Sequence, residues 1–157
     1  MAVEAVENGV EFWLLCRVGR RCCGLALDGV VEIMRPLPIE AVAGAPSFVR
    51  GLAVVRGAPV PVVDMAALLG ESDASLQRMV TVRAGNRRLS LLVGSVIGVR
   101  AVPPAALGGL PPLLQEAAGD VVSAIGVLDA ELLLLLGTGR MLPEAVLASL
   151  GPERAAP

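Results

Sequence analysis

The sequence contains no histidine, no lysine and no tyrosine, and only 2% of its residues are aromatic. Because histidine is absent, there is no imidazole to act as a general base, activate a serine or cysteine nucleophile, bind a metal or accept a phosphoryl group. Because lysine is absent, there is also no P-loop lysine and no Schiff base. Only carboxylate chemistry remains, so the composition argues against an enzyme and predicts neither a metal site nor a cofactor.

The acidic residues that could carry such chemistry all lie at expected turns, caps or strand ends: Asp28, Glu32, Asp64, Asp73, Asp120, Asp129 and Glu131. A hydrolase would need two of them about 5 to 10 Å apart in one cleft. A second alternative is a barrel that binds a small ligand, which would need an enclosed apolar cavity. Both alternatives stay open, but we predict no catalytic residue.

All 13 basic residues are arginines, and the net charge is -2. Nucleic acid is not an expected partner, because binding to a phosphate backbone needs a positive surface. Residues 1–7 lack the positive and apolar regions of a signal peptide, and the longest apolar stretches, 89–99 and 132–136, are shorter than the roughly 20 residues of a membrane span. We therefore expect a cytoplasmic protein with no direct membrane insertion.

The cysteines are few, namely Cys16, Cys22 and Cys23. An odd number argues against a disulfide framework, and the adjacent pair lacks the Cys-x-x-Cys spacing of zinc and redox sites. Neighbouring residues of a strand point to opposite faces, so Cys22 and Cys23 should enter different environments. We expect three reduced thiols. Trp13 is expected in the core.

Ten short apolar segments bounded by glycine, proline or polar residues predict β-strands, at 10–18, 22–27, 31–35, 51–55, 58–63, 79–84, 87–93, 96–102, 121–128 and 131–136. This number is sufficient for two five-stranded barrels. The predicted fold is all-β, with two small barrels packed together and a short C-terminal helix at 142–150.

The expected domain occupies 10–150, after a mobile tail at 1–9 and before a second tail at 151–157. The polar segment 71–77 separates two approximate lobes, 10–70 and 78–137, and the exchange of strands between them is left open. A proline- and glycine-rich linker is expected at 103–119.

The most informative stretch is 48–70, which predicts a hairpin of strands 51–55 and 58–63. Gly57 suits a turn position with positive φ, and two prolines in the second strand place it at an edge or a bulge. Asp64 is expected to cap a short helical turn over 65–69, which Gly70 ends.

Within this stretch, Arg50-Gly-Leu-Ala-Val-Val-Arg-Gly-Ala-Pro-Val-Pro-Val-Val-Asp-Met-Ala-Ala-Leu-Leu-Gly70 resembles the signature of the CheW-like proteins, the coupling proteins of bacterial chemotaxis. The resemblance implies two SH3-like β-barrels and a non-enzymatic adaptor. Its implied partners are the cytoplasmic tips of methyl-accepting chemoreceptors and the histidine kinase CheA, bound through the regulatory domain of the kinase.

The resemblance places the family's partner-binding positions on Arg56, Gly51, Glu32 and Val30. The alternatives are a solvated turn arginine for Arg56, a surface salt bridge for Glu32 and plain core packing for Val30. Apolar residues on strand edges and between the barrels are expected to supply most of the binding energy.

The sequence departs from the family pattern at three positions. Val54 stands where an asparagine is common, Gly94 replaces the aspartate of a Val-Asp pair, and Gly137 follows the last strand in place of Asp or Asn. These departures leave open a divergent scaffold of another chemosensory pathway, such as one for pilus or gliding motility.

Overall fold

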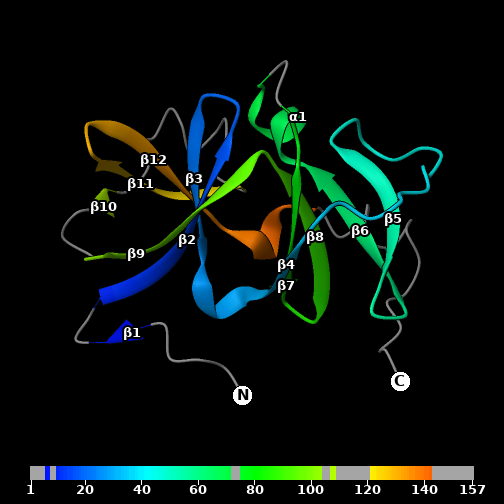
Figure 1. Ribbon diagram of the computed structural model, residues 1–157, viewed down its shortest axis with the longest axis horizontal. Helices are drawn as coiled ribbons and strands as arrows, with labels where there is room; N and C mark the ends of the chain where they lie inside the picture. Colours follow the sequence, from blue (N-terminus) through cyan, green and yellow to red (C-terminus); the bar gives the residue numbers. More distant parts are fainter. Residues whose placement is uncertain (1–5, 8–9, 72–74, 104–106, 109–120, 143–157) are drawn as a thin grey trace.

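The computed structural model describes residues 6–7, 10–71, 75–103, 107–108 and 121–142, and it consists of two curved β-sheets side by side (Figure 1). The elements are β1 (Val6–Glu7), β2 (Val10–Val18), β3 (Arg21–Ala26), η1 (Leu27–Gly29), β4 (Val30–Met34), β5 (Val49–Val55), β6 (Ala58–Asp64), α1 (Met65–Leu69), β7 (Arg78–Ala84), β8 (Arg87–Val93), β9 (Ser95–Val102), β10 (Leu107–Gly108), β11 (Val122–Leu128), β12 (Glu131–Leu136) and η3 (Thr138–Arg140). The predicted all-β fold is confirmed, and each of the ten predicted strands is present.

The seven-stranded sheet, here called the terminal sheet, has the order β1-β2-β3-β12-β11-β10, with β9 also paired to β2. The five-stranded sheet, here called the central sheet, has the order β4-β7-β8-β6-β5. Both sheets combine strands from before and after the segment 71–77, through the parallel pairs β12–β3 and β6–β8. The approximate lobes 10–70 and 78–137 therefore do not coincide with the two sheets, because strands are exchanged between them.

Two short strands lie outside the ten that the sequence indicates. Val6–Glu7, within the expected tail 1–9, forms β1 and pairs with β2. Leu107–Gly108, within the expected linker 103–119, forms β10 and pairs with β11. The predicted helix at 142–150, except for Leu142, and the tail at 151–157 lie outside the described residues.

The apolar side chains form three clusters, because alternate residues of each strand face opposite sides of its sheet. The largest cluster joins the two sheets and includes Leu14, Leu25, Val80, Leu89 and Leu91. A second cluster belongs to the terminal sheet and consists of Trp13, Leu15, Cys22, Val102, Leu133 and Leu135. A third belongs to the central sheet and consists of Ala53, Val55, Val60, Val62, Met79 and Leu92.

The three cysteines are buried and free, and Cys22 and Cys23 do enter different clusters. Burial raises the pKa of Cys16 and of Cys23 to about 12. Both thiols therefore stay protonated at neutral pH and are poor nucleophiles. Trp13 is buried, as expected, at 7% exposure.

In the described part of the chain, no helix has the length and apolar character needed to cross a membrane. The same residues contain no group of three or more histidine, cysteine, aspartate or glutamate side chains placed to hold a metal ion.

Candidate partner-binding site

The β5–β6 hairpin ends in the two-residue turn Arg56–Gly57, with φ angles of 53° and 82°. Two successive positive φ angles are typical of a type I′ turn, whose twist matches that of the paired strands. Gly57 adopts its φ without strain, as its residue type predicts. The turn presents the side chain of Arg56 at the tip of the hairpin, where it is 72% exposed.

The guanidinium of Arg56 binds the carboxylate of Glu32 through two hydrogen bonds. Arg56 Nε donates to Glu32 Oε1 at 3.0 Å, and Arg56 Nη2 donates to Glu32 Oε2 at 2.9 Å. Glu32 belongs to β4, and β4 and β5 are the two edge strands of the central sheet. The sheet therefore curls until its opposite edges are bridged by an ion pair, and two of the predicted partner-binding residues meet.

This pair shifts both of its ionisation equilibria. The hydrogen bonds and the charge of Arg56 lower the pKa of Glu32 below its usual 4.5, and the charge of Arg88 adds to the effect. The same contacts raise the pKa of Arg56 above its usual value. The pair is therefore fully ionised at neutral pH.

We expect a carbon-detected NMR titration to place the pKa of Glu32 below 4.5, and the variant Arg56→Gln to move it back toward that value. Since the folded-state pKa is depressed, the contribution of the pair is present at neutral pH and is lost as the pH falls through that pKa. Glu131, whose pKa is lowered by Arg17, is the internal control and should not respond to Arg56→Gln. An unchanged Glu32 titration in that variant would contradict the assignment.

The other two predicted partner-binding residues are less accessible. Gly51 is buried, has a φ of 141°, and lies so close to the backbone of Glu40 that an added Cβ would sit 1.8 Å from its carbonyl oxygen. Glu40 and Leu52 exchange two backbone hydrogen bonds of 2.9 Å at this point. Val30, at the start of β4, is half-buried and packs against the cluster between the sheets.

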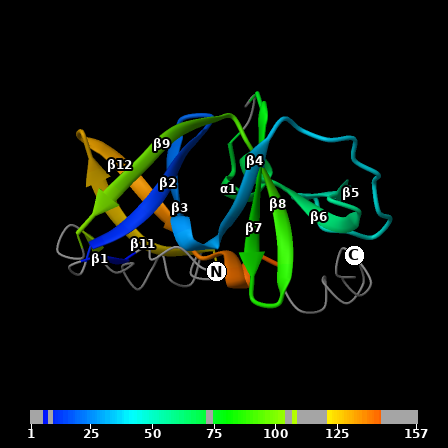
Figure 2. The same ribbon diagram turned by 60° about the horizontal axis from the view of Figure 1, so that its bottom comes forward.

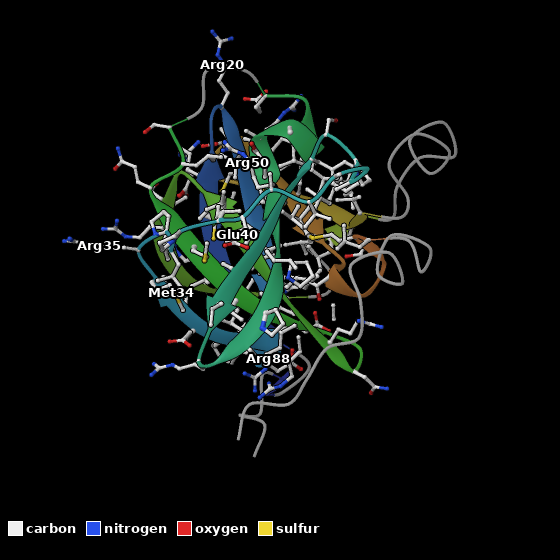
Figure 3. All side chains as sticks on the ribbon, turned by 90° about the vertical axis from the view of Figure 1, so that its right-hand side faces the viewer. Arg20, Met34, Arg35, Glu40, Arg50 and Arg88 are labelled. Carbon is white, nitrogen blue, oxygen red and sulfur yellow. The ribbon has the colours of Figure 1, made fainter. Side chains whose placement is uncertain are left out.

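Asp64 caps helix α1, since its Oδ1 accepts a 3.0 Å hydrogen bond from the backbone N–H of Ala67. Its Oδ2 accepts a second bond, of 2.9 Å, from Arg50 Nε. Gly70 ends the helix with a φ of 72°. Sequence reasoning indicated the cap but missed Arg50, which belongs to the face seen in Figure 3. Arg50 and Asp64 are fourteen residues apart in the sequence, and no helical or strand period relates two residues at that separation. The sequence pattern therefore contains no signal for this contact.

Several large apolar side chains are exposed, and they lie mainly on edge strands. The list is Ile33 on β4, Val54 on β5, Ile97 and Val99 on β9, Val127 on β11 and Leu132 on β12. The edge strand β9 lies at the margin of the terminal sheet, where Figure 2 shows its outer side uncovered by another ribbon. Val54 is 68% exposed and two residues from Arg56. Sequence reasoning expected such residues as a class but did not identify them individually.

One of the three unusual positions, Gly94, has a structural reason to be glycine. The backbone N–H of Gly94 donates to the carbonyl of Arg17 at 2.9 Å, and a Cβ at this position would approach the same oxygen to 2.8 Å. The N–H of Gly137 donates to the carbonyl of Val121 at 2.7 Å. Any residue except proline could donate this bond, and a Cβ at position 137 would make only ordinary contacts, the nearest 3.7 Å from the Cβ of Ser123, so nothing in the structure explains this glycine.

The paired curved sheets have a known architecture. The crystal structure of the scaffolding protein TtCheW from Thermoanaerobacter tengcongensis superimposes with a TM-score of 0.76 over 86% of this chain and 94% of that one, at 19% sequence identity. This similarity defines the fold, with its two SH3-like β domains.

The sequence model of the CheW-like domain matches residues 13–146, and the chain therefore belongs to the CheW-like family. It is 29% identical over 151 residues to the protein FrzA of Myxococcus xanthus, with 92% of each chain covered. It is 22% identical over 143 residues to the chemotaxis protein CheW of Klebsiella aerogenes, covering 89% of this chain and 86% of the relative. As a family member, it is a non-catalytic scaffold or adaptor in chemosensory signalling.

Proposed function

We propose that this protein couples the cytoplasmic tips of chemoreceptors to the histidine kinase CheA, in the cytoplasm, by binding both at once. The observation that carries the proposal is the position of Arg56, which is 72% exposed on a tight turn. A guanidinium held on a rigid turn loses little conformational entropy on docking, and the N–H donors that Arg56 does not use on Glu32 match a carboxylate of a partner. Glu32 keeps the fork oriented before the partner arrives.

The kinase contact is assigned to the β5–β6 hairpin and the neighbouring end of β4. Val54 adds exposed apolar area beside Arg56, and interfaces derive most of their affinity from a few such central residues. Gly51 contributes by allowing β5 to pack on the Glu40 backbone, and Val30 by fixing the start of β4 against the core.

The receptor contact is assigned to the exposed apolar residues of the edge strands. Ile33 on β4 is 44% exposed, and Ile97 and Val99 on β9 are 47% and 49% exposed. An amphipathic helix recognises such a surface by placing its own apolar stripe on it. A receptor tip built of helices fits this requirement.

The proposal predicts that Arg56→Glu weakens binding to the regulatory domain of CheA by about 2 kcal/mol, roughly thirtyfold, and changes binding to a receptor cytoplasmic fragment less. Isothermal titration calorimetry with each partner measures the effect, and circular dichroism with thermal melting checks that the fold is intact. Arg20→Glu is the matched control, because Arg20 is an exposed arginine of the β2–β3 turn that Figure 3 shows pointing away from the molecule. Unaltered binding of Arg56→Glu to the CheA regulatory domain would overturn the assignment.

A second candidate is the same scaffold role in a chemosensory pathway other than swimming chemotaxis, such as pilus or gliding motility. This chain is 29% identical to FrzA of Myxococcus xanthus, a relative whose name does not mention chemotaxis. It is 22% identical to the chemotaxis protein CheW of Klebsiella aerogenes. Val54 also departs from the family pattern at an exposed position. Co-purification of the native protein with its cellular neighbours, followed by mass spectrometry, distinguishes the two, because each pathway would supply its own receptors and kinase.

A further inference from the structure

The two sheets are joined by a contact that involves no residue of the candidate partner-binding site. Glu71 lies just after helix α1, which follows β6 of the central sheet, and its Oε1 accepts a 2.7 Å hydrogen bond from the backbone N–H of Arg20. Arg20 lies in the turn between β2 and β3 of the terminal sheet, and Figure 1 shows this turn and α1 at the same end of the molecule. The side chain of Glu71 is only 16% exposed, and its Oε2 is 3.8 Å from Arg21 Nε. The carboxylate therefore connects the central sheet to a hairpin of the terminal sheet.

Both sides of this contact are held in place. The backbone N–H of Glu71 donates to the carbonyl of Ala66 at 2.8 Å, which attaches the residue to the end of α1. Met65 and Ala66 are themselves buried in the cluster between the sheets. On the other side, Gly19 of the turn has a φ of 57°, and a Cβ at this position would lie 2.7 Å from Oε1 of Glu71. A residue with a side chain at position 19 would therefore displace the carboxylate from the turn.

The bond from Glu71 restricts the angle between the sheets. The apolar cluster between them supplies attraction, but hydrophobic burial is non-directional, whereas a hydrogen bond depends on direction. The N–H of Gly94 also donates to the carbonyl of Arg17, at the point where the chain passes from β8 into β9. That bond lies beside a covalent crossover between the sheets, while Glu71 and Arg20 are 51 residues apart in the sequence. Glu71 therefore supplies a separate restraint on the angle.

The exposed apolar residues assigned to the receptor contact belong to both sheets. Ile33 of β4 is directly paired with Val80 of β7, and Val99 of β9 is directly paired with Leu14 of β2. Val80 and Leu14 both lie in the cluster between the sheets, and directly paired residues share a face of their sheet. Ile33 and Val99 therefore lie on the facing sides of the two sheets. The distance between them depends on the angle between the sheets.

We propose that Glu71 is a positioning residue, whose bond to the β2–β3 turn sets the angle between the sheets and thereby the spacing of the apolar residues that a receptor helix contacts. The part that concerns the receptor rests on the proposed function. A surface whose spacing is already set binds a helix without the entropic cost of ordering it. The kinase contact is assigned to the β5–β6 hairpin and β4, which lie in the central sheet alone. Kinase binding should therefore not depend on Glu71.

The angle is tested by pulsed electron paramagnetic resonance, which measures the distance between spin labels on the two sheets of the full chain. Asn86→Cys in the β7–β8 turn and Val127→Cys on β11 provide exposed labelling sites, while the three native cysteines are buried. We expect a narrow distance distribution in the labelled chain and a broader or shifted one when Glu71→Ala is added. Glu71→Gln keeps an oxygen that can accept from the N–H of Arg20, so its distribution should stay close to the first. An unchanged distribution in Glu71→Ala would overturn the proposal.

The positioning role is tested by calorimetric titration with a receptor cytoplasmic fragment and with the CheA regulatory domain. Glu71→Ala should bind the receptor fragment about tenfold more weakly and change binding to the CheA domain by at most about twofold. Glu131→Ala is the matched control, because it removes a carboxylate whose two hydrogen bonds to Arg17 stay within the terminal sheet. Equal losses of receptor affinity in the two variants, or unaltered receptor binding by Glu71→Ala, would overturn the positioning role.

A pair of glycine variants tests the same contact from the side of the turn. Gly19→Ala and Gly85→Ala each add a methyl group in a hairpin turn, at φ angles of 57° and 64°, but a Cβ at position 85 has no atom of the described chain within 4 Å. We expect Gly19→Ala alone to reproduce the distances and the receptor binding of Glu71→Ala, and the same behaviour in both glycine variants would contradict the proposal. If the distances change as expected but the unaltered protein binds no receptor fragment, the proposed function fails and the role of Glu71 in setting the angle stands.

Discussion

Replacing Gly51 by alanine should lower the free energy of unfolding by about 3 kcal/mol. The backbone of Gly51 has a φ of 141°, which side-chain-bearing residues rarely adopt, and its Cβ position is 1.8 Å from the carbonyl oxygen of Glu40. A methyl group would separate the segment at Glu40 from β5 and break the two hydrogen bonds between Glu40 and Leu52. Urea denaturation followed by circular dichroism measures the loss.

The matched control is Gly98→Ala. Gly98 has a comparable φ of 150°, but no atom of the described chain lies within 4 Å of its Cβ position. This variant should lose only the cost of the unfavourable backbone angle, about 1 kcal/mol. Equal losses at the two positions would show that backbone strain alone, rather than contact with Glu40, explains the requirement for glycine at 51.

The loss of stability in Gly51→Ala also determines how the binding affinity of that variant is interpreted. Gly51 is buried, so a substitution there would reduce binding by displacing β5 and the hairpin that carries Arg56. A loss of affinity in Gly51→Ala is therefore expected to scale with the fraction of unfolded or rearranged protein. Affinity per folded molecule separates this indirect effect from a direct contact, for which Arg56 is the reference.

Local features of this fold were predictable because they depend on neighbouring residues. The hairpin turn at Arg56–Gly57 and the Asp64 cap follow from residue types that favour positive φ or accept a backbone hydrogen bond. Short apolar runs bounded by glycine, proline or polar residues likewise located the ten longer strands. The two-residue strands β1 and β10 are too short to form such a run.

The pairing of distant strands was not predictable in the same way. The parallel pair of β12 with β3 joins segments more than a hundred residues apart, and no local pattern specifies that partner. The bond between Arg56 and Glu32 depends on the curl of the whole central sheet, which brings opposite edges together. The sequence therefore indicated both residues as candidates, while their contact required the three-dimensional arrangement.

The five consecutive leucines at 132–136 differ widely in their exposure to solvent. Strand alternation directs Leu133 and Leu135 into the cluster of the terminal sheet, and Leu134 and Leu136, on the other side, pack in the cluster between the sheets. Leu132 lies on that second side too, but near the start of the strand, and it is 47% exposed. Residue type alone therefore does not predict the exposure of each leucine.

Leu135→Ala should therefore lower the free energy of unfolding by about 3 kcal/mol, because the side chain is fully buried and its removal leaves a cavity among Trp13, Leu15 and Leu133. Leu132→Ala, three residues earlier on the same strand, should cost less than about 1 kcal/mol, since it removes area that water already reaches. Urea denaturation of both variants gives the comparison. Similar losses would mean that the side chain of Leu132 is itself buried, and Leu132 would then no longer belong to the exposed apolar surface available to a partner.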